Sequence, residues 1–541
     1  MPHKSPYPNV PIPERTVHDF VLEALEKNIR EKKNEIAFID SSNNYAPYTN
    51  ETLKSEAYTV GSYLYSIGFK KDVAATYLPN TVHYAAFFLG VAMNGGAISG
   101  ASALFTDFEL HKQLVDSNAK VVLTNHVSLP RLLLAIKDTK VAKIIVVGQN
   151  RENALPEIAV SWDQVMQTPI VDIPKPKIDV RRDVIFLPFS SGTTGSPKGV
   201  MQTHYNFMAM IASYYTLEEA SFKGGFDGWD WTKENACLYL PIYHNYGFNM
   251  MLRCVIRNMT GVLIHQFDLK LFLKVLQDYK VRVLPMAPPI VVMLSKSPLC
   301  DEFNITSLHA VFVAAAPIGK DLIEKLMKRH PNIKYVQQGY GMTECTLASH
   351  LPDLRVKVPI GSVGRLAPNY SMMIVNPDTW IELPDGQQGE ICLGGPTVML
   401  GYLSKPKETA AIVRNGWLHT GDIGYVDADG FLYIVDRMKE LIKVRGLQVA
   451  PSELEDVLLS NPRIRDCAVV GVPHELLGEV PKAYVVKADR MLTENEVKEF
   501  VKVKVAEFKY LEGGVEFIDQ IPKSAAGKIL RRVLRDRNNN K

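Results

Sequence analysis

A loop rich in hydroxyl groups, glycines and one lysine is the clearest chemical signal in this sequence. The segment 190–199 reads SSGTTGSPKG and follows the apolar run 184–187. Glycines let backbone N–H groups approach an anion, hydroxyl groups donate hydrogen bonds to it, and lysine adds positive charge. The spacing differs from G-x-x-x-x-G-K-[ST], because Lys198 follows Ser196-Pro197 and no serine or threonine comes after it. The loop predicts a polyphosphate site of another kind, with a plain polar surface turn as the alternative.

Four further segments carry residue types suited to nucleotide chemistry. They read YGMTE at 340–344, GWLHTGD at 416–422, DRMKELIKVRG at 436–446 and IPKSAAGKILR at 521–531. Each alone is compatible with a strand end, a turn or a solvated charged run. In this order and together with 190–199, they resemble the adenylate-forming superfamily of acyl- and aryl-CoA ligases, luciferases and peptide-synthetase adenylation domains. The similarity covers residues 20–534 and is greatest to 4-coumarate–CoA ligase-like and luciferase-like acyl-CoA ligases.

The resemblance implies a site for ATP and Mg²⁺. Tyr340 is expected to stack on adenine, Thr343 to contact the α-phosphate, and Glu344 to bind Mg²⁺, which prefers hard carboxylate oxygens. Asp422 is expected to accept hydrogen bonds from both ribose hydroxyls, assisted by Arg437. The expected ATP- and AMP-binding residues are Ser190, Ser191, Gly192, Thr193, Thr194, Gly195, Lys198, Ala316, Gln338, Gly339, Tyr340, Thr343, Asp422, Arg437, Lys439, Lys443 and Lys528.

The resemblance also implies a two-step reaction. Lys528 aligns with the superfamily's catalytic lysine, an ammonium placed where negative charge converges as a carboxylate attacks the α-phosphate. This step gives an acyl-adenylate and pyrophosphate. The small domain would then turn about Lys439, withdraw Lys528 and let the CoA thiol displace AMP. The full expected catalytic set is Lys528, Thr343, Glu344 and His244, and the expected CoA contacts are Arg445 and Gly446.

The family alignment also predicts an acid pocket. Its expected wall is mainly apolar, which suits an aromatic acid or a medium- or long-chain fatty acid. The wall residues are His244, Asn245, Tyr246, Met250, Ala315, Gly341, Leu347 and Ala348. The segment 243–248 has no acidic residue of the kind that peptide-synthetase adenylation domains use for an amino group, which argues against an amino-acid substrate.

Two other functions stay open beside an acid–CoA ligase. An adenylating enzyme could pass its acyl group to a carrier protein or to oxygen, as luciferase does. A non-catalytic relative could only bind nucleotide, but the presence of Lys528, Glu344 and Asp422 argues against it.

Composition places further limits on the class of protein. The 541 residues are 46% hydrophobic and 22% charged, an ordinary globular mixture long enough for two or more domains. A net charge of +3 is too small to indicate a nucleic acid or an anionic membrane as partner. Six cysteines without a C-x-x-C pair indicate free buried thiols in a reducing compartment.

No targeting or membrane-spanning segment is expected. The N-terminus lacks the apolar stretch of a signal peptide and the C-terminus lacks a Ser-Lys-Leu type peroxisomal signal, so the cytoplasm is the expected location. Residues 73–106 have no charged side chain, but Pro79, Asn80 and Asn94 favour a buried helix at 84–93, a turn and a strand over a membrane span. The oligomeric state stays open.

The pattern of elements predicts how these residues are positioned. Apolar strand-like runs alternate with amphipathic helical stretches, as in α/β proteins: strands at 120–124, 143–148, 281–285 and 310–314, helices at 269–279 and 320–330. The pattern of predicted elements changes near residue 436. Beyond it the sequence predicts a helix that begins at Pro451, strands at 466–472 and 482–486, and a capping box at Thr493–Glu496. We therefore predict an α/β fold. A large domain, residues 1–436, binds ATP and the acid, and a small mobile α+β domain, residues 437–541, follows a hinge near Lys439.

Overall fold

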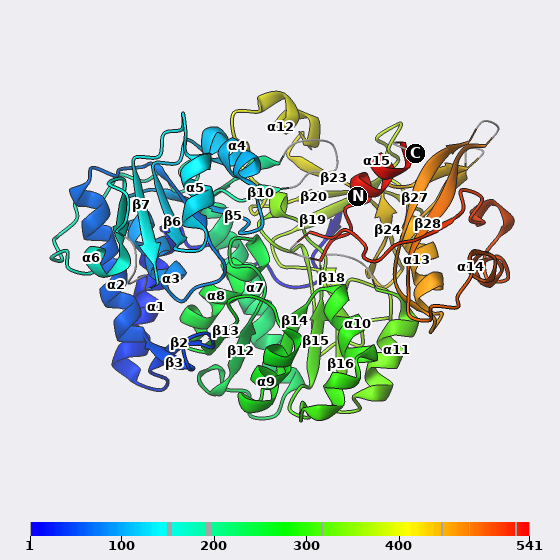
Figure 1. The fold of residues 1–541 in the computed structure, drawn as a ribbon, viewed down its shortest axis with the longest axis horizontal. Helices are drawn as coiled ribbons and strands as arrows, with labels where there is room; N and C mark the ends of the chain where they lie inside the picture. Colours follow the sequence, from blue (N-terminus) through cyan, green and yellow to red (C-terminus); the bar gives the residue numbers. More distant parts are fainter. Residues whose placement is uncertain are drawn as a thin grey trace.

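The computed structural model of this protein describes residues 2–148, 154–190, 197–314, 318–444, 447–474, 477–524 and 527–539. Figure 1 shows an elongated molecule, with helices α1 to α6 at one end and the sheet that contains β27 and β28 at the other. Helices and sheets are mixed along the whole length, as the sequence predicts.

The first sheet carries the phosphate loop at one edge. Its strand order is β10-β11-β9-β5-β4-β6-β7-β8, with β21 paired to β11. The neighbouring strands β5, β4, β6 and β7 run parallel to one another. The strands are β4 (Val73–Tyr77), β5 (Ala97–Ala101), β6 (Val121–Asn125), β7 (Lys143–Val147), β8 (Ala159–Ser161), β9 (Val184–Phe186), β10 (Phe189–Ser190), β11 (Lys198–Thr203) and β21 (Gly401–Tyr402). The helices around it are α1 (Val17–Glu31), α2 (Asn50–Ser66), α3 (His83–Met93), α4 (Asp107–Ser117), α5 (Leu129–Ala135) and α6 (Trp162–Val165).

The uncharged stretch 73–106 belongs to this first sheet. It forms β4, the buried helix α3 and β5, which confirms the predicted helix, turn and strand. Within the described ranges, every helix is too short or too polar to cross a lipid bilayer.

Two further sheets position the helices of the expected acid pocket. One has the order β12-β13-β2-β3 and the other the parallel order β14-β15-β16. The strands are β2 (Ile36–Asp40), β3 (Ala46–Thr49), β12 (Asn235–Leu238), β13 (Thr260–Leu263), β14 (Val283–Met286), β15 (Ala310–Val313) and β16 (Tyr335–Gln338). The helices are α7 (His204–Gly225), α8 (Asn245–Arg257), α9 (Leu269–Asp278), α10 (Pro288–Lys296) and α11 (Lys320–Arg329). The ring of Phe248 on α8 stacks on Phe186 of β9 with centroids 4.3 Å apart, which joins α8 to the first sheet.

A mainly antiparallel sheet follows and ends at the predicted hinge. Its order is β1-β19-β20-β23-β22, with β24 paired to β23, and β17 and β18 form a separate pair. The elements are β1 (His3–Lys4), β17 (His350–Leu351), β18 (Arg365–Leu366), β19 (Ser371–Val375), β20 (Gly389–Gly394), α12 (Pro406–Ile412), β22 (Val413–Arg414), β23 (Trp417–Val426) and β24 (Leu432–Arg437). Asp422 and Arg437 are directly opposite each other in the β23–β24 register.

The C-terminal sheet has its own apolar core. Its order is β26-β25-β28-β27, with β29 beside β28. The elements are β25 (Ile442–Val444), β26 (Leu447–Val449), α13 (Pro451–Leu459), β27 (Ile464–His474), β28 (Gly478–Lys487), α14 (Glu494–Lys502), β29 (Val515–Phe517) and α15 (Arg531–Asn539). The predicted capping box is present, because Thr493 and Glu496 exchange hydrogen bonds at the start of α14.

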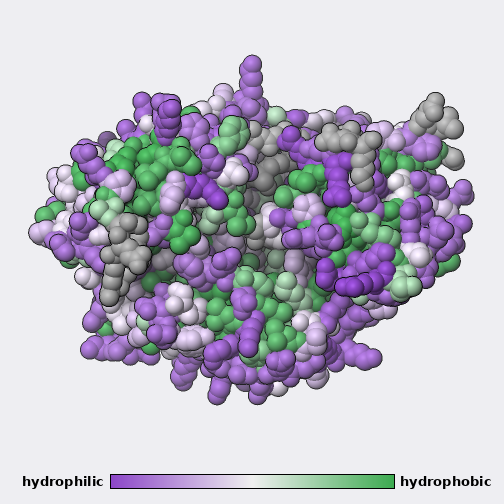
Figure 2. All heavy atoms as spheres, viewed as in Figure 1, coloured by the Kyte–Doolittle hydropathy of each residue, from purple (hydrophilic) through white to green (hydrophobic). Residues whose placement is uncertain are grey.

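The visible surface is mainly hydrophilic (Figure 2), with an apolar area over α4 and α5. Leu104, Phe108, Val127 and Leu134 are the exposed apolar side chains there. All six cysteines are buried and unpaired, as the sequence predicts.

Candidate active site

A cavity of about 410 Å³ lies between the large sheets and the C-terminal sheet. Its size is in the range of ordinary small-molecule sites. The large-domain part includes Pro288, Ile318, Gln338, Gly339, Tyr340, Gly341, Asp422 and Arg437. The C-terminal part includes Glu440, Ser452, Glu455, Asp456, Lys523, Gly527, Lys528 and Arg531. Six predicted nucleotide-site residues separated by up to 190 positions in the chain thus line one cavity, namely Gln338, Gly339, Tyr340, Asp422, Arg437 and Lys528.

Asp422 is the charged acceptor at the centre of this cavity. The Tyr340 hydroxyl donates to its Oδ2 at 2.7 Å, and Nε of Arg437 lies 3.3 Å from its Oδ1. Burial raises the pKa of Asp422, and the charge of Arg437 and the hydrogen bond from Tyr340 oppose that rise. The paired strands β23 and β24 hold the carboxylate and guanidinium side by side, so the acceptor is fixed before a ligand arrives.

Lys528 faces Asp422 from the C-terminal domain. Its loop is tightly tied, because Ser524 N–H donates to the Lys528 carbonyl at 2.8 Å and Lys528 N–H donates to the Ser524 hydroxyl at 3.2 Å. Burial lowers the pKa of Lys528 to about 8, and the charge of Arg437 acts in the same direction. Gly527 has a φ of +80°, and a Cβ there would lie 3.1 Å from Pro289 of α10, so glycine lets the loop approach the large domain.

Glu344 lies outside this cavity, beside Ser190 at the start of the phosphate loop. Its carboxylate is buried and its Oε1 accepts from the Ser190 hydroxyl at 3.0 Å and from the Tyr402 hydroxyl at 2.8 Å. Nζ of Lys198 lies 5.0 Å from the centre of the Tyr402 ring. Sequence reasoning missed Tyr402, because a lone Gly-Tyr pair far from every motif carries no signal of its own.

The loop from Tyr340 to Ala348 is strained and closely packed. A Cβ at Gly341 would lie 2.0 Å from the Leu347 carbonyl oxygen and 2.4 Å from the Ala348 Cα, so only glycine fits. Leu347 has a φ of +118°, a backbone conformation that costs about 1–3 kcal/mol in a non-glycine residue. Such strain is typical of sites where a loop must hold polar groups at fixed positions.

Four of the predicted acid-pocket residues, His244, Asn245, Tyr246 and Met250, lie at the start of α8, whereas Gly341 lines the cavity described above. His244 is the N-cap residue, and its Nδ1 accepts from the Tyr246 backbone N–H at 3.3 Å, which leaves the ring proton on Nε2. Burial lowers the pKa of His244 to about 4, so the ring is neutral near pH 7. Tyr246 and Met250 follow one turn apart on one face of α8.

Comparison with known proteins shows the family. Residues 25–403 match the AMP-binding enzyme family, and residues 453–528 match the AMP-binding enzyme C-terminal domain. The chain is an AMP-binding enzyme. A protein named 4-coumarate:CoA ligase 1 from Petunia hybrida is 38% identical over 543 residues, 99% of this chain and 96% of that one. A 4-coumarate–CoA ligase 1 from Solanum tuberosum is 39% identical over 547 residues, again 99% and 96% of the two chains.

Among solved structures, ATP-bound MatB from Rhodopseudomonas palustris has the same fold. Its TM-score is 0.84 at 23% identity, covering 97% of this chain and 99% of that one. The comparisons confirm the predicted architecture and the predicted enzyme class, an AMP-forming acid–CoA ligase. The roles of individual residues stay predictions.

Several predicted site residues of this AMP-binding enzyme are not part of the cavity as described. Lys439 and Lys443 are exposed and do not line it. His244, Tyr246, Thr343 and Glu344 do not line it either. The predicted residues Ser191, Gly192, Thr193, Thr194, Gly195, Ala315, Ala316, Arg445 and Gly446 lie outside the described residues.

A buried ion pair that the sequence did not reveal lies beyond Met250. Nη1 of Arg253 donates to Oε1 of Glu218 on α7, and the two side chains are 2% and 5% exposed. Arg253 follows Tyr246 and Met250 on the same face of α8. Trp231 lies behind the pair, with its ring centre 5.9 Å from the Arg253 guanidinium. A charged residue within an apolar helix gives no sequence signal until its partner on another helix is known.

Proposed function

We propose that this AMP-binding enzyme joins a compact carboxylic acid to CoA through an acyl-adenylate. The proposal is supported above all by one observation: Lys528, Asp422, Arg437 and Tyr340 line the same cavity. Asp422 supplies a fixed acceptor for ribose hydroxyls, and Lys528 supplies an ammonium beside it. An ammonium so placed stabilises negative charge as the acid carboxylate attacks the α-phosphate of ATP.

The residues around Glu344 fit a magnesium ion. The carboxylate is buried, and within the described part of the chain its hydrogen-bond donors are the hydroxyl groups of Ser190 and Tyr402, so its oxygens keep lone pairs for a hard cation. When bound, Mg²⁺ would neutralise phosphate charge. Glu344 would hold it, and Thr343, next in the chain, would contact the phosphate.

His244 is suited to orient the acid. Its neutral ring presents Nε2–H as a donor, because Nδ1 is already used by the Tyr246 backbone. A donor at the mouth of an apolar pocket fixes one carboxylate oxygen and leaves the other free to attack.

After adenylation, the small domain would turn about Lys439. This residue is exposed and lies between β24 of the large domain and β25 of the small one. Ser452 N–H donates to Asp436 Oδ2 across this boundary at 3.0 Å, and the Ser452 hydroxyl donates to the Val435 carbonyl at 3.0 Å. These bonds support the arrangement with Lys528 in the cavity and would break on turning, which would free the site for the CoA thiol.

The acid pocket is proposed to end at the Glu218–Arg253 pair. Tyr246 and Arg253 are seven positions apart, about 10 Å along the axis of α8. An extended sixteen-carbon chain is about 18 Å long at about 1.2 Å per bond. A long alkyl chain would have to press against a buried ion pair, so the pocket favours an aryl acid or a medium-chain acid.

Removing the Glu218–Arg253 pair is expected to let the enzyme accept acids with longer alkyl chains. In Glu218→Ala/Arg253→Ala both charges are lost together, which avoids the penalty of about 3–5 kcal/mol for leaving one buried charge unpaired. We expect kcat/KM for a C14 or C16 acid to rise about 10-fold relative to C6, since each newly buried methylene contributes about 0.8 kcal/mol. The measurement is the ratio of kcat/KM values across C6–C16 acids.

The matched control is Glu234→Ala/Arg282→Ala, an ion pair just before β12 and β14 whose side chains are 10% and 28% exposed. It should leave the chain-length ratio at its wild-type value. A wild-type enzyme that prefers C16 over C6 and aryl acids would contradict the compact pocket.

The function itself is tested by pyrophosphate release with Mg·ATP on aromatic and C6–C18 acids, with and without CoA. Turnover that needs CoA and yields a thioester supports the proposal. Pyrophosphate release without any CoA-stimulated thioester would favour the second candidate, an adenylating enzyme with another acyl acceptor. Absence of release on every acid would overturn both.

A further inference from the structure

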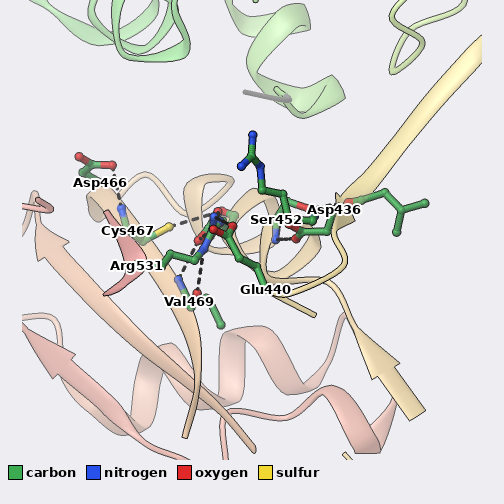
Figure 3. A network of polar contacts seen from close by, with 10 residues as sticks. Asp436, Glu440, Ser452, Asp466, Cys467, Val469 and Arg531 are labelled. Carbon is green, nitrogen blue, oxygen red and sulfur yellow. Dashed lines mark hydrogen bonds and ion pairs between the residues drawn. The ribbon is translucent and has the colours of Figure 1, made fainter. Parts of the chain in front are cut away.

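Arg531 is at the centre of a buried polar network in the C-terminal domain (Figure 3). Its Nη1 donates to Glu440 Oε2 at 2.6 Å, and its Nη2 lies 2.8 and 2.7 Å from the two carboxylate oxygens of Glu455. Its Nε donates to the Val469 carbonyl at 3.2 Å. Each of the three guanidinium nitrogens thus donates a hydrogen bond, and the side chains of Arg531, Glu440 and Glu455 are only 10–11% exposed.

The three charged residues come from three separate elements. Arg531 is the first residue of α15 and lies three positions after Lys528. Glu455 is on α13, and its Oε1 also accepts from the Val469 backbone N–H at 2.8 Å. Glu440 directly follows Lys439, at the start of the C-terminal domain. The network therefore ties the end of the Lys528 loop to the residue next to the proposed hinge.

Lys528 lies close to this network. Glu440 and Arg531 both shift its pKa, Glu440 upward and Arg531 downward, so both charges lie near the ammonium. The backbone bonds between Ser524 and Lys528 hold one side of the loop, and Arg531 holds the other. Asp436 and Ser452 lie beside the network in the same view.

We propose that Arg531 is the positioning residue for Lys528. It fixes the lysine loop to Glu440 and Glu455, so that the ammonium reaches the reacting carboxylate and α-phosphate at one defined point. All three members lie on the C-terminal side of Lys439, so the network moves with Lys528 as one unit. The inference rests on the proposed adenylation step.

Arginine is required here by geometry. Its planar fork binds two carboxylates and a carbonyl at fixed angles, whereas a lysine ammonium is a single point charge. A 1 Å misplacement of a catalytic group can lower a rate about 100-fold. Arg531→Lys should therefore misplace Lys528 while keeping the charge.

The first test compares the two half-reactions. We expect Arg531→Lys to lower acyl-adenylate formation about 10-fold and Arg531→Gln about 100-fold. Thioester formation from supplied acyl-adenylate and CoA should stay within about 2-fold, because Lys528 has left the site at that step. The control is Arg532→Gln, whose 75% exposed side chain faces solvent. Equal losses in both half-reactions, or unchanged adenylation in Arg531→Lys, would overturn the assignment.

The second test uses the alkaline limb of kcat/KM for adenylation. The groups that face Lys528 are Asp422 on β23, Arg437 on β24, Glu440 before β25 and Arg531 on α15. Arg531→Gln removes a nearby cation, so the limb should move to higher pH. Glu440→Gln removes a nearby carboxylate, so the limb should move to lower pH. A merely structural role predicts no such opposite displacement, and shifts in one direction would contradict the proposal.

A third readout does not depend on turnover. Backbone amides of residues 527–534 should exchange with deuterium faster in Arg531→Lys than in the wild type, while those of β6 in the large domain keep their wild-type rates. Wild-type exchange at 527–534 would overturn the positioning role whether or not the adenylation step is established. Failure of wild-type protein to release pyrophosphate would instead overturn the proposed function.

Discussion

Lys528→Ala is expected to lower acyl-adenylate formation about 100- to 1000-fold, the loss usually seen when one group that stabilises transition-state charge is removed. The physical reason is the position of the ammonium, which shares a cavity with Asp422 and Arg437. Thioester formation from supplied acyl-adenylate should remain within about 3-fold of wild type, because the proposed mechanism withdraws Lys528 from the site in that step. The measurement is pyrophosphate release from acid and ATP, paired with a thioester assay on synthetic acyl-adenylate.

The proposed role of Lys528 also predicts how adenylation by the wild-type enzyme depends on pH. In the proposed adenylation step Lys528 must be protonated to stabilise the phosphate, and burial lowers its pKa to about 8. Adenylation should therefore fall as pH rises through about 8, whereas the thioester step should not follow that limb. Lys498→Ala is a suitable control, since that lysine pairs with Glu494 on the surface of α14. Loss of both half-reactions in Lys528→Ala would show that the lysine acts on folding or on both steps.

Glu344→Gln is expected to lower adenylation about 100-fold and to weaken the dependence on Mg²⁺. Glutamine keeps the size of the side chain but removes the charge that a hard cation needs. The measurement is the initial rate of pyrophosphate release as a function of Mg²⁺ concentration at constant ATP.

Tyr402→Phe is the matched variant for this position. It removes the hydroxyl that donates to Glu344 at 2.8 Å but leaves the carboxylate charge. We expect a loss of about 10-fold or less, as for removal of one supporting group around a metal ligand. An unchanged Mg²⁺ dependence in Glu344→Gln would contradict the assignment of the metal to this carboxylate.

Local patterns in the sequence predicted much of the fold. The runs 120–124 and 143–148 became β6 and β7, and the capping box at Thr493 starts α14 as expected. These predictions succeeded because buried parallel strands and capped amphipathic helices leave short-range signals. The uncharged stretch 73–106 was also assigned correctly, since its prolines and asparagines break a membrane-length helix.

The candidate site was predictable where whole motifs carried it. Gln338, Gly339, Tyr340, Asp422, Arg437 and Lys528 line one cavity. The partners of those residues were not predictable, because they are set by packing between distant segments. Tyr402 beside Glu344 and Glu218 beside Arg253 are separated by 58 and 35 positions. Arg531 belongs to the motif 521–531, but its partners Glu440 and Glu455 come from distant segments that only the folded chain brings together.

The most direct measurement is a single-turnover reaction of excess enzyme with acid and Mg·ATP, quenched before and after CoA is added. The account predicts acyl-adenylate and pyrophosphate in equal amounts before CoA, and conversion of the adenylate to acyl-CoA and AMP afterwards. Acyl-CoA that forms without a prior adenylate, or ATP that is consumed to ADP, would contradict the central claim.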